Sequence, residues 1–175
     1  MSKASYELGM VSRVNVEALG EPGKRTFRLL VDSPIGSAVL WLEKEQLLEM
    51  GLYIKQALAQ AAVAESESPT PHPEPAPGNL SVEFKVGKLA LEYVDDQGLF
   101  RFWNHDIEAE EQEDAKLGFE ATSSQATALS DEALKVCAAG RPLCPLCHQS
   151  MDAEGHLCAR SNGHRPADQG GPEEE

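Results

Sequence analysis

Basic residues are scarce in this chain of 175 amino acids. Only 15 Lys and Arg residues stand against 29 Asp and Glu residues, which gives a formal net charge of −14. A protein with this charge repels phosphate backbones and anionic lipid surfaces. No run rich in Lys and Arg makes a local exception. The composition therefore argues against a broad nucleic-acid or membrane surface, and a nucleic-acid-associated regulator ranks third among the functions that we consider.

Long apolar runs are also missing. No stretch approaches the roughly 20 apolar residues that a membrane-spanning helix needs. The first twenty residues, MSKASYELGMVSRVNVEALG, are interrupted by Glu7 and Arg13 and contain no apolar segment of signal-peptide length. We therefore expect a cytoplasmic protein without a membrane anchor, in which thiols stay reduced.

Common active-site motifs are incomplete or absent. The stretch GEPGKRT, residues 20–26, partly matches a phosphate-binding loop, but Ala18 replaces the first glycine and Arg25 replaces the hydroxyl residue. A turn between two strands is the better interpretation. His105 lies next to Asp106, but no nucleophile can be assigned to this pair. An enzyme of unknown class that uses these two residues is the alternative function.

The hydrophobic fraction of 41% is enough to build a core. Alternating apolar residues predict strands at residues 26–32, 37–42, 80–86, 89–94 and 99–103, with a turn at Gly87-Lys88. Helical spacing predicts helices at residues 43–65 and 122–140. The second helix begins with the capping-box pattern Thr122-x-x-Gln125. We predict an α+β fold with a mostly antiparallel sheet, two covering helices and a strand-pair-then-helix order that occurs twice.

Three further features concern the predicted body, residues 1–140. Residues 65–79 carry a proline at nearly every second position, which predicts a solvated linker or long loop. Gly51 weakens its helix by about 1 kcal/mol relative to Ala unless it permits close packing. Cys137 falls on the apolar side of the second helix and is interpreted as a buried structural thiol.

The segment RPLCPLCHQSMDAEGHLCARSNGH, residues 141–164, contains three of the four cysteines and three of the five histidines. Its Cys-x-x-Cys-His motif is also found at c-type haem sites, but haem attachment normally follows export, and no export signal is present. A redox dithiol needs the first cysteine near the start of a helix, whereas Pro142 and Pro145 flank Cys144. Zinc explains more of the segment than either alternative.

The spacing of the remaining ligands supports zinc. Cys144 and Cys147 form a knuckle that can hold one tetrahedral ion, and the ten residues before Cys158 can form a short hairpin that returns further ligands. His156 or His164 can complete a set of three cysteines and one histidine. Four protein ligands leave no coordination position for water, so we predict a structural zinc rather than a catalytic one.

Several segments occur together in one known family. They are GEPGKRTF, LWLEKEQ, FKVGKLALEY, TSSQATAL and AGRPLCPLCHQSMDAEGHLCARSNGH, in this order. In these segments the chain resembles a family of bacterial proteins, common in actinobacteria, that is called domain of unknown function 3090. The resemblance implies that Cys144, Cys147, His156 and Cys158 are the metal ligands, with His164 as the alternative fourth ligand. It further implies partners similar to histidine phosphatases or lipid kinases.

Together these observations predict three parts, namely the body 1–140, a zinc-ribbon-like module 141–166 and an acidic disordered tail 167–175. The favoured function is a zinc-binding bacterial protein that serves as a non-enzymatic adaptor or protein-interaction module. The zinc braces the chain and performs no reaction.

Overall fold

The computed structural model describes residues 4–61, 80–110 and 114–139, and also Cys144, Leu146, Cys147, Met151 and Cys158. The predicted linker 65–79, most of the predicted zinc-ribbon-like module and the predicted tail lie outside the described residues. The division into three parts therefore stays a prediction.

Seven strands and two helices make up the described part of the chain. The strands are β1 (Ala4–Met10), β2 (Arg13–Leu19), β3 (Thr26–Ser33), β4 (Gly36–Leu42), β5 (Leu80–Val94), β6 (Leu99–Asp106) and β7 (Ala115–Thr122). The helices are α1 (Lys44–Gln60) and α2 (Ser123–Ala138). The strands form one sheet in the order β1-β7-β6-β5-β4-β3-β2. Only the pairs β1–β7 and β4–β5 are parallel, so the predicted α+β class with a mostly antiparallel sheet is confirmed.

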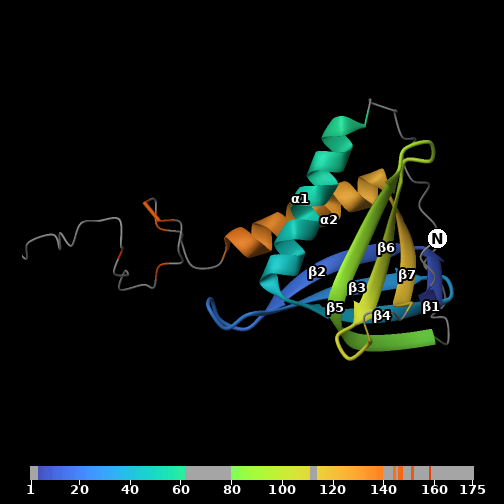
Figure 1. Ribbon diagram of the computed structural model, residues 1–175, viewed down its shortest axis with the longest axis horizontal. Coiled ribbons are helices and arrows are strands. Elements are labelled where there is room, and N and C mark those ends of the chain that lie inside the picture. The colour runs from blue at the N-terminus through green and yellow to red at the C-terminus, as the bar shows by residue number, and fades with distance from the viewer. Residues whose placement is uncertain are drawn as a thin grey trace, which may run out of the picture.

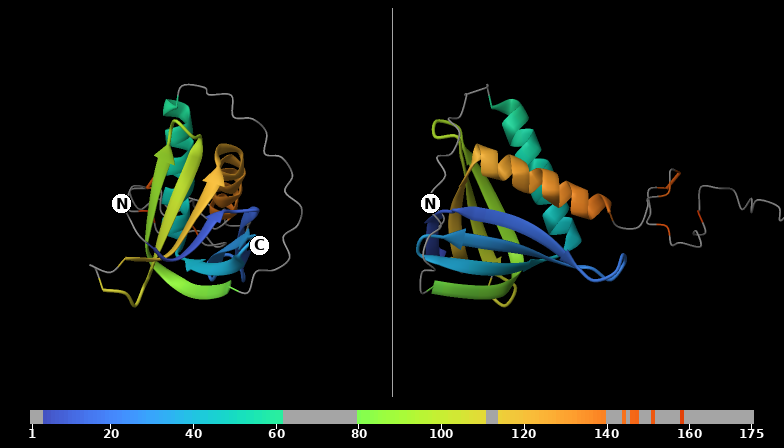
Figure 2. Two further views of the ribbon diagram at one scale, coloured as in Figure 1. Left: turned by 90° about the vertical axis from the view of Figure 1, so that its right-hand side faces the viewer. Right: turned by 180° about the vertical axis from the view of Figure 1, so that it is seen from behind.

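The sheet bends sharply and holds both helices in the angle that it forms (Figure 1). In Figure 2, β2, β3 and β4 run across the lower part of the molecule, whereas β6, β7 and the second half of β5 rise away from them. Helix α1 packs against α2, and α2 also packs against β2. No helix among the described residues is long and apolar enough to cross a membrane.

Two copies of one arrangement build this fold. In the second copy, residues 80–85 of β5 pair in parallel with β4, and residues 86–94 pair antiparallel with β6. In the first copy, β1 pairs in parallel with β7, and β2 pairs antiparallel with β3. The long strand β5 therefore corresponds to β1 and β2 joined end to end. The first strand segment of each copy pairs with the last strand of the other copy, β1 with β7 and the first half of β5 with β4.

Sequence register supports this duplication. The run Phe27–Leu29 of β3 corresponds to Phe100–Phe102 of β6, and in each run the two outer side chains are buried. The arginine between them points to the opposite face, as strand geometry requires. Arg28 bonds Glu17 at 2.7 Å, and Arg101 bonds Glu120 at 2.8 Å. The two copies thus place an apolar pair inward and an ion-paired arginine outward at equivalent positions, while the glutamates come from strands that do not correspond, β2 and β7.

Both helices begin with a capping box that has glutamine at its third helical position. The side chain of Gln46 accepts a bond from the backbone N–H of Glu43 at 2.9 Å. The side chain of Gln125 accepts one from the backbone N–H of Thr122 at 3.0 Å. These contacts satisfy N–H groups that the first turn of a helix leaves without partners. The N-terminus predicted for the second helix is confirmed.

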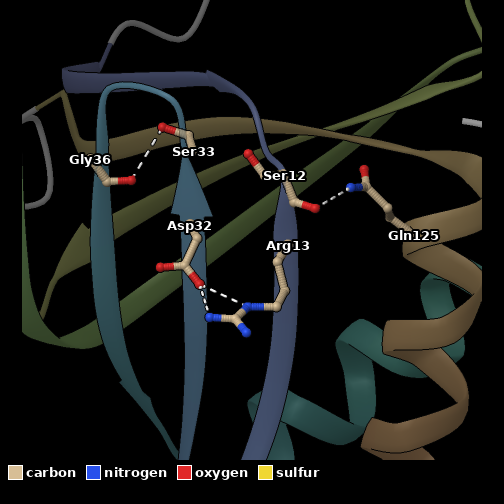
Figure 3. A network of polar contacts seen from close by, with 6 residues as sticks. All are labelled: Ser12, Arg13, Asp32, Ser33, Gly36 and Gln125. Atoms are coloured by element: carbon tan, nitrogen blue, oxygen red, sulfur yellow. Dashed lines mark hydrogen bonds and ion pairs between the residues drawn. The ribbon is translucent and has the colours of Figure 1, made fainter. Parts of the chain in front are cut away.

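The same two glutamines also donate hydrogen bonds to the backbone at the bends in the strands. The amide nitrogen of Gln46 donates to the carbonyl oxygens of residues 86–87, each at 3.1 Å. The amide nitrogen of Gln125 donates to the carbonyl oxygens of residues 11–12, at 2.9 and 3.4 Å. Figure 3 shows the Gln125 amide directed at the carbonyl of Ser12. Each helix start is thereby tied to the bend of an equivalent strand path.

The helices cross where Gly51 of α1 meets Ser130 of α2. A Cβ atom at Gly51 would lie 3.1 Å from Cγ of Leu134, and the Ser130 hydroxyl donates to the Gly51 carbonyl at 2.7 Å. Met50 and Ile54, on either side of the crossing, are buried. Gly51 therefore permits close packing of the two helices, the one condition under which a weakening of its helix was not expected.

One expectation about the elements is wrong. The turn expected at Gly87-Lys88 is an irregularity inside β5, because the strand continues to Val94 while its pairing with β6 shifts between Val86 and Lys88. Glycine is needed there because a Cβ atom would lie 2.7 Å from Cα of Ile107. The predicted order of a strand pair before each helix is confirmed, because the antiparallel pair β3–β4 precedes α1 and the antiparallel pair β6–β7 precedes α2.

Candidate metal centre

Three cysteines, two from the Cys-x-x-Cys motif and one eleven positions after it, lie close together and form the candidate centre. The sulfur atoms of Cys144, Cys147 and Cys158 all lie within 4.8 Å of one another. Cys144 is 4% exposed, and the other two are partly buried. The Cys144 and Cys158 sulfur atoms are 3.8 Å apart, much farther than the roughly 2.05 Å of a disulfide bond. The cluster is therefore a set of thiols that could hold a metal ion.

The distance between the sulfur atoms fits tetrahedral coordination. In an ideal tetrahedron, ligand sulfurs about 2.3 Å from a zinc ion lie about 3.8 Å from each other. The separation of the Cys144 and Cys158 sulfurs, 3.8 Å, equals that edge length. Thiolates are also ligands that select soft or borderline ions such as zinc. The donor set and its spacing therefore suit such an ion.

Backbone donors surround the first sulfur. The N–H of Leu146 donates to the Cys144 sulfur at 3.4 Å. A bond from the backbone of Cys147, and secondarily that from Leu146, lowers the pKa of Cys144. Both donors belong to the turn between the two cysteines of the Cys-x-x-Cys motif. The spacing of the motif predicts a tight turn, but it does not predict these hydrogen bonds. The local backbone thus favours the thiolate form that binds metals.

The fourth predicted ligand is a histidine. His156 and His164 both lie outside the described residues. The described residues bring together three of the four predicted ligands, and the choice between the two histidines stays a prediction. So does the identity of the metal.

Cys137 does not belong to the cluster. Its side chain is 6% exposed on α2, with the sulfur 3.9 Å from the carbonyl oxygen of Lys44. Burial raises the pKa of this thiol. The prediction of a buried structural thiol is confirmed.

The adjacent residues His105 and Asp106 do not form a catalytic dyad. They are successive residues of β6, so their side chains point to opposite faces of the sheet. The Asp106 carboxylate forms an ion pair with Lys116 and accepts a bond from the N–H of Glu108 at 3.1 Å. The Lys116 contact and, after it, the Glu108 contact lower the pKa of Asp106. This carboxylate is engaged in holding β6 to β7.

The GEPGKRT stretch connects β2 to β3 as a hairpin turn. Gly20 and Gly23 have φ angles of 97° and 90°, which only glycine adopts readily. The N–H of Lys24 donates to the carbonyl of Glu21 at 2.9 Å and closes the turn. The turn interpretation is confirmed.

Comparison with known proteins adds one match. A protein-family model described as "Protein of unknown function (DUF3090)" matches residues 6–158, from β1 through the last cysteine of the cluster. No curated protein and no solved structure matches the chain.

Proposed function

The chain belongs to the DUF3090 family of proteins of unknown function, and we propose that it is a zinc-binding adaptor that docks another protein and catalyses no reaction. In this proposal the zinc ion is structural. The observation that carries it is the cluster of three sulfur atoms within 4.8 Å of one another.

The ligands that we propose are Cys144, Cys147, Cys158 and one histidine, with His156 preferred over His164. A set of three cysteines and one histidine is common in structural zinc sites and fills all four tetrahedral positions. The family resemblance, in which the histidine two residues before the last cysteine belongs to the motif, supports His156. A filled coordination sphere leaves no place for a reactive water and therefore favours a structural ion.

The adaptor role is supported by how the body uses its polar groups. Among the described residues, the pair suggested for catalysis is separated, with Asp106 committed to Lys116 and His105 on the opposite sheet face. The acidic charge of −14 disfavours nucleic acids as the partner. Recognition of a protein in the cytoplasm is the function that agrees with both features.

The metal proposal is tested by comparing two equivalent substitutions. Purified protein should carry about one zinc ion per chain, and Cys144→Ser should reduce this to near zero because it removes one thiolate ligand. Cys137→Ser is the matched control, since it changes a cysteine outside the cluster and should leave the zinc content unchanged. Elemental analysis of dialysed protein gives the stoichiometry. Full zinc retention in Cys144→Ser would refute the ligand assignment.

The fourth ligand is tested by a second pair of variants. His156→Ala should weaken zinc binding far more than His164→Ala, because a histidine that binds the ion contributes more to the affinity than one that only contacts a ligand or lies outside the site. Competition against a chromophoric chelator measures both affinities. The reverse order would assign His164 as the ligand. Unchanged zinc affinity in both variants would show that neither histidine binds the ion.

The partner proposal rests on family association alone. We expect the adaptor to bind a protein similar to histidine phosphatases or to lipid kinases. Affinity purification from the native host, followed by mass spectrometry, should recover one of these proteins with wild-type bait. The Cys144→Ser bait distinguishes partners that need the metal module from those that bind the body.

A further inference from the structure

A groove between α1 and the second half of β5 is left open on the body. It measures about 440 Å³ and is lined by Gln46, Glu49, Met50, Tyr53, Leu89 and Leu91, among others. Figure 1 shows α1 beside this part of β5. Tyr53 is 40% exposed, and Leu89 and Leu91 are only partly buried. The groove therefore leaves apolar side chains of both elements accessible.

The equivalent place in the other copy is closed. There α2 packs against β2, and Val14 and Val16, which correspond to Leu89 and Leu91, are 8% and 6% exposed. The duplicated fold thus covers one strand with its helix and leaves the equivalent strand half uncovered. This asymmetry points to an additional occupant beside β5.

The backbone of β5 indicates what kind of occupant fits. Residues 86–94 pair with β6 on one side, whereas pairing with β4 on the other side ends at Lys85. Within the described ranges, no strand pairs with that second edge of residues 88–94. An open edge presents alternating N–H and C=O groups that another extended strand can satisfy. An extended strand is therefore the kind of occupant that fits this edge.

We propose that this strand is β5 of a second copy of the chain, paired antiparallel about Ala90. The sequence KLALEYV, residues 88–94, complements itself in that register. Lys88 would lie opposite Glu92 of the partner subunit, and Leu89 opposite Leu91 of the partner subunit. By symmetry each pair occurs twice, as a two-fold interface requires. Opposite charges and apolar pairs at directly opposed positions stabilise antiparallel strands.

Lys88, one of the two charged residues in this register, is available for such pairing. Lys88 is exposed and forms no ion pair with any residue that the structure describes. The residues of β2 that correspond to Lys88 and Glu92 are Arg13 and Glu17, which are already bonded to Asp32 and Arg28. Figure 3 shows the Arg13 guanidinium directed at Asp32. Self-pairing is therefore expected at β5 and not at β2.

Charge exchange tests the register directly. Sedimentation equilibrium between about 1 and 100 μM should show a wild-type dimer. Lys88→Glu alone and Glu92→Lys alone should each weaken it on the order of tenfold, because like charges then face each other at two places. An equimolar mixture of the two variants should restore the dimer as a heterodimer, since every opposed pair is again of opposite sign.

Further variants separate the interface from general charge effects. Lys24→Glu makes the same change of charge on the exposed β2–β3 turn and should leave the dimer unaffected. The double variant Lys88→Glu with Glu92→Lys should dimerise as the wild type does. A folded wild type that stays monomeric throughout, or single variants whose mixture does not recover, would overturn the proposal. A monomer that binds an extended segment of another protein at β5 would overturn it as well. The test does not involve the zinc ligands, so its result is independent of the metal proposal.

Discussion

Gln46 and Gln125 show how one side chain can join two levels of structure. The oxygen of each amide accepts a bond from the N–H group that opens its helix, and the nitrogen of the same amide donates to carbonyls of a bent strand. Glutamate could perform the first task but not the second, because a carboxylate has no N–H group to donate. The amide is therefore required at both positions.

We expect Gln125→Glu to lower the free energy of unfolding by about 1–3 kcal/mol, because the carbonyls of residues 11–12 lose their donor and face a carboxylate. The cap itself should survive, since the carboxylate still accepts from Thr122. Urea titration at neutral pH measures the change. Gln46→Glu is the matched variant and should cost less, because the Gly87 carbonyl that it abandons is more exposed. Unchanged stability in Gln125→Glu would remove the proposed role of the amide.

Only half of this role could be predicted from the sequence. The spacing of Thr122 and Gln125 identifies a capping box because both groups belong to one turn of helix. The second bond joins Gln125 to Val11, 114 positions away. Local patterns contain no information about such a contact. The same limit applies to the metal centre, where spacing predicted the three-cysteine cluster but not the N–H group of Leu146 that bonds Cys144.

At the scale of elements, the crossing of α1 and α2 depends on the absence of a side chain at Gly51. Its backbone approaches Leu134 so closely that an added Cβ atom would lie 3.1 Å from Cγ. Alanine at this position improves helix propensity by about 1 kcal/mol but crowds the crossing. The two effects oppose each other, so a single substitution does not separate them.

A double-mutant cycle separates propensity from crowding. In the wild-type background, Gly51→Ala should gain little or nothing, whereas in a Leu134→Ala background it should stabilise by up to about 1 kcal/mol. Gly51→Val should destabilise by about 1–3 kcal/mol, because its larger side chain cannot be accommodated. Thermal or urea unfolding of the wild type, the two single alanine variants and the double alanine variant gives the coupling free energy between positions 51 and 134. Strictly additive effects of the two alanines would mean that the helices do not touch at this position.

Two features of the sheet were not predicted from the sequence, strand β7 and the continuity of β5 through Gly87, and they share a physical reason. β7 reads AKLGFEAT, where small residues and Gly118 weaken the alternation that marks a strand. Gly87 looks like a turn signal, yet glycine is there because the backbone of Ile107 leaves no room for a Cβ atom. In both cases the glycine answers a tertiary contact. The helices and the strands β3, β4 and β6 were predicted because their apolar residues keep a clear helical or alternating pattern.

For the whole molecule, the exchange of strands between the two copies has a thermodynamic consequence. β1 pairs with β7 and the first half of β5 pairs with β4, so each copy completes its sheet with a strand of the other. The helices add a further contact between the copies at Gly51 and Ser130. Neither copy can lose its strands without exposing an edge and an apolar face of the other. We therefore expect the body to unfold as one cooperative unit in spite of its duplication.

Each copy contains one tryptophan that reports on its own state, Trp41 in β4 and Trp103 in β6. Single-tryptophan variants, made by Trp103→Phe or Trp41→Phe, should each show one unfolding transition in urea. Adding Leu40→Ala, at a fully buried position of the first copy, should cost about 2–5 kcal/mol and lower the stability reported by either tryptophan equally. Leu117→Ala, in the second copy, should do the same. A Leu40→Ala effect confined to Trp41 fluorescence would show that the copies unfold separately, and the exchanged strands would then contribute little to holding them together.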